Sequence, residues 1–268
     1  MSDVAVGSRV RDDSIEGSMA KAVWHPSREE EDALAHQGHV ATMGRVDQIW
    51  PWLAQKHGQI LAVDAPHAAH PERFCYGELA AQIALAAAAF RHHGIGSGEV
   101  VAFFAENSPR WLVADQGLMR TGAANAVRGA TAPVEELRYI LEDSGAIALV
   151  VQSAELWHKL ALTEEQKRGL RLVLQLEGEP ADGLLGWDAL LAAGAGQPAP
   201  DPLKDRARDS AASATATILY TSGTTGQPKG VPLSHANLLH QMRCLACVAY
   251  PSPGAPVLSV LPIWHAYE

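Results

Sequence analysis

Short apolar segments alternate with helical segments along most of the chain, and this alternation restricts the fold more than any other feature of the sequence. "VVAFFA" at residues 100–105 is typical of a strand that is buried on both faces of a sheet. Ser108 is a suitable N-cap and Pro109 a suitable first helical residue, which predicts a helix that ends at Gly122. Its predicted buried stripe consists of Trp111, Ala114, Leu118 and Met119. Later strands are predicted at "ANAVRG", "AIALVVQ", "LRLVLQL" and "TATILY", and helices at "PVEELRYILEDSG" and "AELWHKLAL". This order predicts an α/β fold with a doubly wound parallel sheet.

The remaining segments indicate the domain organisation. Residues 1–45 are charged and dotted with Gly and Ser, so we expect a variable, loosely ordered N-terminal segment. Apolar residues recur at helical spacing over Tyr76–His93, and Gly94 supplies a stop. Residues 178–213 are rich in Gly, Ala, Pro and Asp, which predicts a surface connection with one short helix over Trp187–Leu191. We therefore expect one domain over residues 46–268.

Composition and charge argue against several classes of protein. A formal net charge of -9 disfavours a nucleic-acid-binding protein, which needs a basic face. The three cysteines fit a reducing compartment better than a disulfide framework, and Cys244 and Cys247 are expected to pack in a core and bind no metal. The longest apolar run, residues 83–90, is far below the roughly 20 residues of a membrane-spanning helix. The sequence predicts a cytoplasmic protein with no transmembrane segment and no metal site, while peripheral contact with a membrane stays open.

The strongest chemical signal is the run "YTSGTTGQPKG" at residues 220–230, which follows the predicted strand "TATILY". It differs from the phosphate-binding loop of nucleotide hydrolases, because Pro228 and Gly230 stand where that loop requires a glycine and a hydroxyl residue. A few extended residues then precede Ser234, which can cap a helix.

Phosphate binding is nevertheless what the chemistry of this run favours. Glycines that accept positive φ let successive backbone N–H groups converge on an anion, and hydroxyls and a lysine add further donors. The glycines are Gly223, Gly226 and Gly230, and the side-chain donors are Thr221, Ser222, Thr224, Thr225 and Lys229. A Gly-rich surface turn is the alternative.

The longer run "ILYTSGTTGQPKGVPLSHANL" resembles the signature loop of the adenylate-forming (AMP-binding) superfamily, which includes acyl-CoA synthetases, peptide-synthetase adenylation domains and luciferases. Its members activate a carboxylate with ATP and Mg²⁺ to give an acyl-adenylate and pyrophosphate, and they then transfer the acyl group to a thiol. The resemblance implies that the loop wraps the β- and γ-phosphates of ATP and stabilises the charge that develops on pyrophosphate. The residues given this role are Thr221, Ser222, Gly223, Thr224, Thr225, Gly226 and Lys229.

Two further stretches narrow the resemblance. "LSVLPIWHAYE" at residues 258–268 is similar to the next motif of the superfamily, and this similarity implies that Trp264 and His265 line the pocket for the acyl group and the adenylate. Together with "FAENSPRWLVADQGLMRTGAANAVRG", it resembles long-chain fatty acid synthetases of the cyanobacterial and plastid type. Those enzymes load fatty acids onto acyl carrier protein or coenzyme A. Within "ENSPRW", Arg110 and Trp111 are interpreted as scaffold.

The later motifs of the superfamily have no recognisable counterpart in the 268 residues. These are the segment that stacks adenine and holds Mg²⁺, the aspartate that binds ribose, the hinge, and the C-terminal domain with the catalytic lysine, which Lys229 cannot replace. We therefore expect an N-terminal portion of a fatty acid ligase with an incomplete large domain, weak or inactive alone, for which a separate C-terminal half is a candidate partner. Two alternatives stay open: adenylation of an amino or aryl acid, and a non-catalytic remnant or partner-binding module.

Overall fold

The computed structural model describes residues 28, 42–204, 212–221, 227–245 and 253–262. Its helices are η1 (Val46–Gln48), α3 (Ile49–His57), α4 (Tyr76–His92), α5 (Pro109–Thr121), α6 (Val134–Asp143), α7 (Ala154–Leu160), α8 (Glu164–Gly169), α9 (Trp187–Gly194) and α10 (His235–Leu245). Its strands are β1 (Leu61–Ala65), β2 (Glu72–Cys75), β3 (Val100–Phe104), β4 (Ala124–Arg128), β5 (Ala148–Val151), β6 (Val173–Gln175), β7 (Leu185–Gly186), β8 (Thr215–Thr221) and β9 (Lys229–Ser234).

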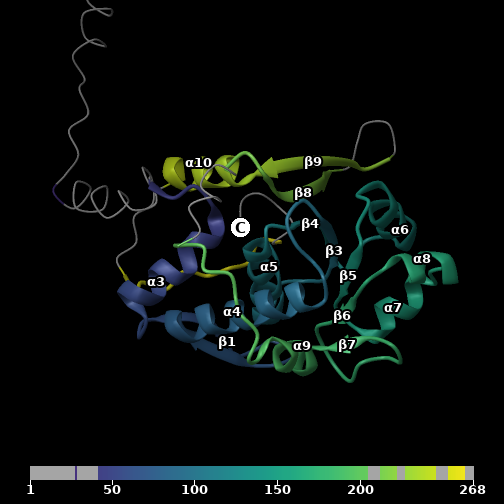
Figure 1. Cartoon of the computed structure of the whole chain (residues 1–268), viewed down its shortest axis with the longest axis horizontal. Coiled ribbons are helices and arrows are strands. Elements are labelled where there is room, and N and C mark those ends of the chain that lie inside the picture. Colours follow the sequence, from purple (N-terminus) through teal and green to yellow (C-terminus); the bar gives the residue numbers. More distant parts are fainter. Residues whose placement is uncertain (1–27, 29–41, 205–211, 222–226, 246–252, 263–268) are drawn as a thin grey trace, which may run out of the picture.

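The central sheet has the strand order β7–β6–β5–β3–β4–β8–β9 within the described residues (Figure 1). All neighbouring strands are parallel except β8 and β9, which are antiparallel. The parallel sheet confirms the prediction. The extended residues after the loop were expected, but their return beside β8 as an edge strand was not. Strands β1 and β2 form a separate antiparallel pair.

Helices cover both faces of the sheet, because alternate strand residues point to opposite sides. Val101 and Phe103 of β3 pack in a cluster with α4, α5 and α9. Ala102 and Phe104 pack in another cluster with α6 and α7. All four side chains are fully buried. The sheet is therefore doubly wound, as the sequence predicted.

Helix α5 is more deeply buried than an amphipathic surface helix. Its ends are as expected: the Ser108 hydroxyl accepts from the Trp111 backbone N–H at 3.1 Å, and Gly122 has a φ of 92°. All four residues of the predicted stripe are buried, which confirms it, and residues on the other faces of the helix are buried as well. Gly117 permits this packing, since a Cβ there would lie 2.6 Å from the Cβ of Ala86 on α4.

Several elements carry no clear sequence signal or differ from the prediction. The short helix α8 and strands β1, β2 and β7 were not predicted, and α9 extends to Gly194. Cys244 on α10 is exposed, so its predicted place in a core is wrong, and Cys247 lies outside the described residues. Arg110 pairs with Glu72 at 3.1 Å and donates to the Leu176 carbonyl at 2.7 Å, which agrees with a scaffold role.

Candidate functional site

The β8–β9 hairpin carries the ends of the predicted phosphate loop. Thr221 and Lys229 are opposite each other in the register of the two strands, so the hairpin brings together the first and last residues of the predicted set. Both are exposed. The five residues predicted between them lie outside the described residues: Ser222, Gly223, Thr224, Thr225 and Gly226.

The loop begins at the carboxyl edge of the parallel sheet. Strand β8 runs parallel to β4, and β4 runs parallel to β3, so the carboxyl ends of the three strands meet at one edge. Asn107 and Ser108 follow β3 at this same edge. Ligands of open α/β sheets bind outside this edge.

Tyr220 fixes β8 to the helix layer directly before the loop. Its hydroxyl donates to Asp143 Oδ2 at 2.8 Å, at the end of α6, and burial with this carboxylate raises the pKa of the Tyr220 hydroxyl above its ordinary value. Gly230 passes directly over the ring, because a Cβ there would lie 3.0 Å from Tyr220 Cζ. Gly230 is an extended strand residue without positive φ, so the prediction that it uses positive φ to bring backbone N–H groups together is wrong. A glycine is needed at this position because the backbone of β9 lies so close to the Tyr220 ring.

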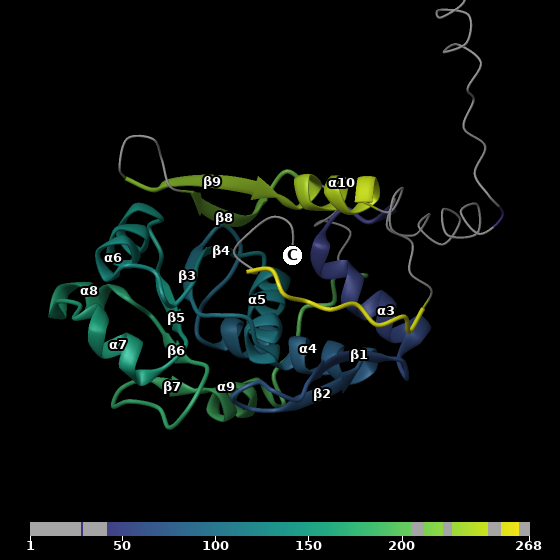
Figure 2. The same cartoon turned by 180° about the vertical axis from the view of Figure 1, so that it is seen from behind.

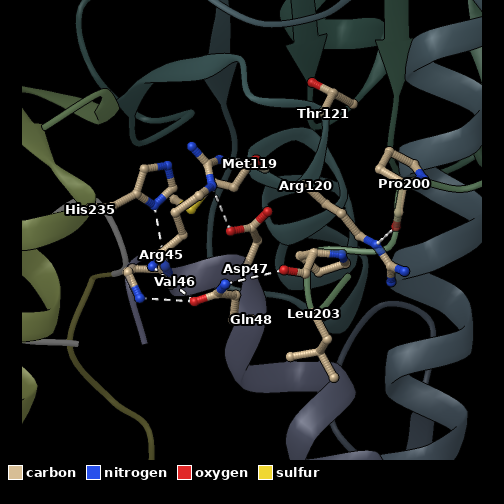
Figure 3. A network of polar contacts seen from close by, with 12 residues as sticks. Arg45, Val46, Asp47, Gln48, Met119, Arg120, Thr121, Pro200, Leu203 and His235 are labelled. Atoms are coloured by element: carbon tan, nitrogen blue, oxygen red, sulfur yellow. Dashed lines mark hydrogen bonds and ion pairs between the residues drawn. The ribbon is translucent and has the colours of Figure 1, made fainter. Parts of the chain in front are cut away.

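A buried polar network fixes the other end of the hairpin (Figure 3). His235, the first residue of α10, is buried, and its Nδ1 accepts from the Val46 backbone N–H at 3.3 Å. Beside it, Arg45 donates to Asp47 Oδ1 at 2.9 Å and to the Met119 carbonyl of α5 at 3.0 Å. The side chains of the Arg45–Asp47 pair are 3% and 0% exposed. The network thus joins the chain before α3 to both α5 and α10.

The same network reaches the connection that precedes β8. Gln48 Nε2 donates to the Pro202 carbonyl at 3.1 Å, and Arg120 Nε donates to the Pro200 carbonyl at 2.6 Å (Figure 3). The residues just before β8 are tied to α10 as well, since the His235 N–H donates to the Ala214 carbonyl at 3.1 Å. Backbone on both sides of the hairpin is therefore held by buried hydrogen bonds.

A cavity of about 970 Å³ lies beside the hairpin. Its walls come from α3, β1 and the turn after it, one side of α5, strands β4 and β8, α10, and the segment 257–259. Figure 2 shows this last segment passing in front of α5. Leu219 of β8, Trp111 of α5 and Leu238 of α10 are among the apolar lining residues.

A buried polar group lies among these apolar walls. Asp115 Oδ2 accepts from Gln116 Nε2 at 2.7 Å, and Asp115 Oδ1 accepts from Nδ2 of Asn125 on β4. Gln116 Oε1 in turn accepts from the indole N–H of Trp50 at 2.7 Å. We call Asp115, Gln116 and Asn125 the polar floor of the cavity. Burial raises the pKa of Asp115 to about 7, although hydrogen bonds from the two amides oppose this shift.

The polar floor was not predicted from the sequence. A signal was present, because Asp115 lies four residues after Trp111 and three before Leu118, and therefore in phase with the predicted buried stripe. A charged residue in such a position must be either solvated or paired. Asn125 gave a weaker signal, as a polar residue within the short strand "ANAVRG".

The first residues of the second predicted motif, with Val257 before them, lie at the mouth of the cavity. Asn107 Nδ2 donates to the Leu261 carbonyl at 2.7 Å, and Val257 and Leu258 are 78% and 84% exposed. Trp264 and His265, which were predicted to line the acyl pocket, lie outside the described residues.

The described part of the chain shows neither a candidate membrane-spanning helix nor a candidate metal-binding cluster. None of its helices has both the length and the apolar character that a membrane crossing requires. It also holds no group of three or more His, Cys, Asp or Glu side chains arranged to bind a metal ion.

A comparison with protein families decides the assignment that the loop suggested. Residues 51–268 match the family described as AMP-binding enzyme. The chain belongs to this family. The match includes the loop, the polar floor and all of the cavity walls except Val46 and Trp50.

Relatives within the AMP-binding family include fatty acid ligases. The chain is 38% identical over 236 residues to the chloroplastic long-chain-fatty-acid–[acyl-carrier-protein] ligase AEE15 of Arabidopsis thaliana, which covers 83% of this chain and 32% of that protein. It is 33% identical over 193 residues to the long-chain-fatty-acid–CoA ligase FadD15 of Mycobacterium tuberculosis, covering 70% of this chain and 31% of the relative. The chain thus spans about a third of the length of these relatives.

Solved structures agree with the fold. The anthranilate CoA ligase AuaEII in complex with anthranoyl-AMP superimposes with a TM-score of 0.61 at 19% identity, over 72% of this chain and 35% of that one. This likeness supports the architecture of an adenylate-forming N-terminal domain, and the low identity limits it to the fold.

Proposed function

We propose that this chain forms the ATP-phosphate-binding part of a ligase that activates a long-chain fatty acid. In the first step a carboxylate oxygen attacks the α-phosphorus of ATP, the bond to pyrophosphate breaks, and an acyl-adenylate forms. In the second step a thiol of coenzyme A or acyl carrier protein attacks the acyl carbonyl carbon, and AMP leaves. The β8–β9 hairpin carries the proposal, because it sets Thr221 and Lys229 opposite each other at the base of the family's loop, beside a mainly apolar cavity.

Each proposed loop residue has a role that its chemistry suits. The Lys229 ammonium and the hydroxyls of Thr221, Ser222, Thr224 and Thr225 would donate to phosphate oxygens, and Gly223 and Gly226 would let backbone N–H groups approach them. Because pyrophosphate gains charge as it leaves, donors that meet it in the transition state accelerate adenylation. Mg²⁺ would accompany the ATP phosphates, and none of this chain's residues is assigned to bind it.

The acid is proposed from the relatives and from the cavity. Both relatives described above are long-chain fatty acid ligases by name, and an apolar cavity suits an aliphatic chain. Trp264 and His265 are proposed to close this pocket near the adenylate. The proposal includes the division into a variable segment over residues 1–45 and an adenylation domain from residue 46, and it places the activity in the cytoplasm.

Fatty-acid-dependent exchange of pyrophosphate into ATP tests the assignment. The chain alone should give weak exchange or none, and exchange should appear when the remaining two thirds of a relative is supplied by fusion or as a separate polypeptide. Exchange that responds to amino or aryl acids and not to fatty acids would contradict the proposed substrate. No exchange with any acid, in a folded fusion, would favour a non-catalytic module.

Replacing Thr224 and Thr225 by alanine tests the loop in the same fusion. Loss of donors that act in the transition state should lower the adenylation rate by about 100-fold or more. Thiolation of preformed acyl-adenylate should change little, because pyrophosphate has already left. Equal loss in both half-reactions would show that the substitutions disrupted the fold and would refute the phosphate role.

A further inference from the structure

The polar floor of the cavity has no role in the proposed adenylation. We propose that Asp115, Gln116 and Asn125 select aliphatic acids that carry a hydrogen-bond donor, a hydroxyl or an ammonium group, on the chain. This inference rests on the proposed function, since it assumes that the acid enters this cavity with its carboxylate toward the loop. It adds a substrate class that an apolar fatty acid pocket would not favour.

The position of the floor suits the far end of a bound acid. Asn125 is paired with Thr217 in the register of β4 and β8, and Thr217 also lines the cavity. Thr221, at the base of the phosphate loop, lies four residues farther along β8. At about 3.3 Å per residue, the floor is about 13 Å from the loop base along the strand. An acid with its carboxylate near the loop would therefore present a distant part of its chain to the floor.

The floor offers acceptors. Asp115 lines the cavity, and its Oδ2 and Oδ1 accept from the side-chain amides of Gln116 and Asn125. Gln116 Oε1 accepts from the Trp50 indole. Asn125 is only 1% exposed, and its Oδ1 has no hydrogen-bond partner. A buried acceptor without a partner loses its hydration without compensation, so a ligand donor that reaches it is favoured.

The charge of the floor is also uncompensated. None of the ion pairs among the described residues includes Asp115, which is 2% exposed. A hydroxyl on the ligand would satisfy Asn125 Oδ1, and an ammonium group would in addition oppose the carboxylate charge. A terminal methyl group would leave Asn125 Oδ1 without a donor and the carboxylate without an opposing charge.

Binding of three matched acids to the 268-residue chain at pH 8 tests the inference, with quenching of tryptophan fluorescence as the signal. Trp50 and Trp111 both line the cavity, so its occupation should change their emission. We expect ω-hydroxydodecanoate and ω-aminododecanoate to bind at least about tenfold more tightly than dodecanoate. Burial of apolar surface alone predicts the opposite order, because the polar group makes transfer to an apolar cavity less favourable.

Two variants assign the preference to named atoms. Asn125→Leu keeps a similar volume without the acceptor, and it should abolish the preference for the hydroxy acid. Asp115→Asn removes the charge and should weaken binding of ω-aminododecanoate more than binding of ω-hydroxydodecanoate, whereas Asp182→Asn makes the same change at an exposed position and should have no effect. Far-UV circular dichroism checks that each variant is folded.

The outcomes separate this inference from the proposed function. If wild-type protein binds dodecanoate as tightly as the hydroxy acid, or if folded Asn125→Leu keeps the preference, the polar floor does not select donors. In that case the assignment as a fatty acid ligase is unaffected. If none of the three acids binds, the cavity is not the acyl site and the inference fails, while pyrophosphate exchange still tests the ligase assignment independently.

Discussion

Replacing Asp115 by asparagine should make the free energy of unfolding less dependent on pH between about pH 5 and pH 8, where buried Asp115 titrates. In the folded chain the pKa of Asp115 is raised from 3.8 to about 7, mainly by burial. A carboxyl whose pKa is higher in the folded than in the unfolded state keeps its proton in the folded chain at pH values where it ionises in the unfolded chain. Ionisation therefore favours the unfolded chain as the pH rises. The contribution of the carboxyl to stability is therefore complete below about pH 4 and is lost as the pH rises to about 7.

The size of this loss follows from the shift. At about 1.4 kcal/mol per pKa unit, a rise of about three units costs the folded state about 4 kcal/mol above pH 7. About 2–3 kcal/mol of this loss falls between pH 5 and pH 8. The asparagine variant does not ionise. Its amide can accept from Gln116 and, after the Asn125 amide turns over, donate to Asn125 Oδ1, so the floor keeps its hydrogen bonds.

Urea denaturation followed by far-UV circular dichroism at pH 5, 6, 7 and 8 measures the effect. The free energy of unfolding of Asp115→Asn, relative to wild type, should rise by about 2–3 kcal/mol from pH 5 to pH 8. Asp182→Asn at an exposed position should show no such trend. A difference between Asp115→Asn and wild type that stays constant across this range would refute the reasoning, because Asp115 would then titrate alike in the folded and unfolded chains.

Two further substitutions test how α5 is held. Gly117→Ala should lower the free energy of unfolding by about 1–3 kcal/mol, because its Cβ would lie 2.6 Å from Ala86 Cβ, and chemical denaturation measures this loss. Gly169→Ala, whose Cβ would meet nothing within 4 Å, is the matched control and should be neutral or slightly stabilising. Ser108→Ala removes the N-cap of α5 and should cost about 1 kcal/mol in the same assay, whereas Ser108→Thr should recover most of it; equal losses in both variants would contradict the capping role.

The sequence predicted the elements of the sheet well because local signals define them. The cap at Ser108, the stop at Gly122 and the apolar run at residues 100–105 each depend on neighbouring residues, and the structure confirms all three. The resemblance of "YTSGTTGQPKG" to a family loop identified the family, which the match over residues 51–268 confirms.

Features that depend on distant residues could not be predicted in this way. The need for a glycine at position 230 comes from the Tyr220 ring on the neighbouring strand, and not from the backbone angles of a phosphate loop. The polar floor joins Asp115 of α5 to Asn125 of β4, and its proximity to the cavity depends on the order of strands in the sheet. Such contacts follow from tertiary packing, which a periodic pattern does not contain.

The contact between His235 and the Val46 backbone has a consequence for the biosynthesis of the chain. The two residues are 189 positions apart, so the segment that contains Val46 leaves the ribosome long before α10 is made. Until then, the buried ion pair of Arg45 and Asp47 lacks one wall of its final environment. The contact between Val46 and α10 therefore forms only after β3, β4 and β5 have all been synthesised. Synthesis of α10 supplies the missing contact and fixes the base of the β8–β9 hairpin, where His235 follows β9.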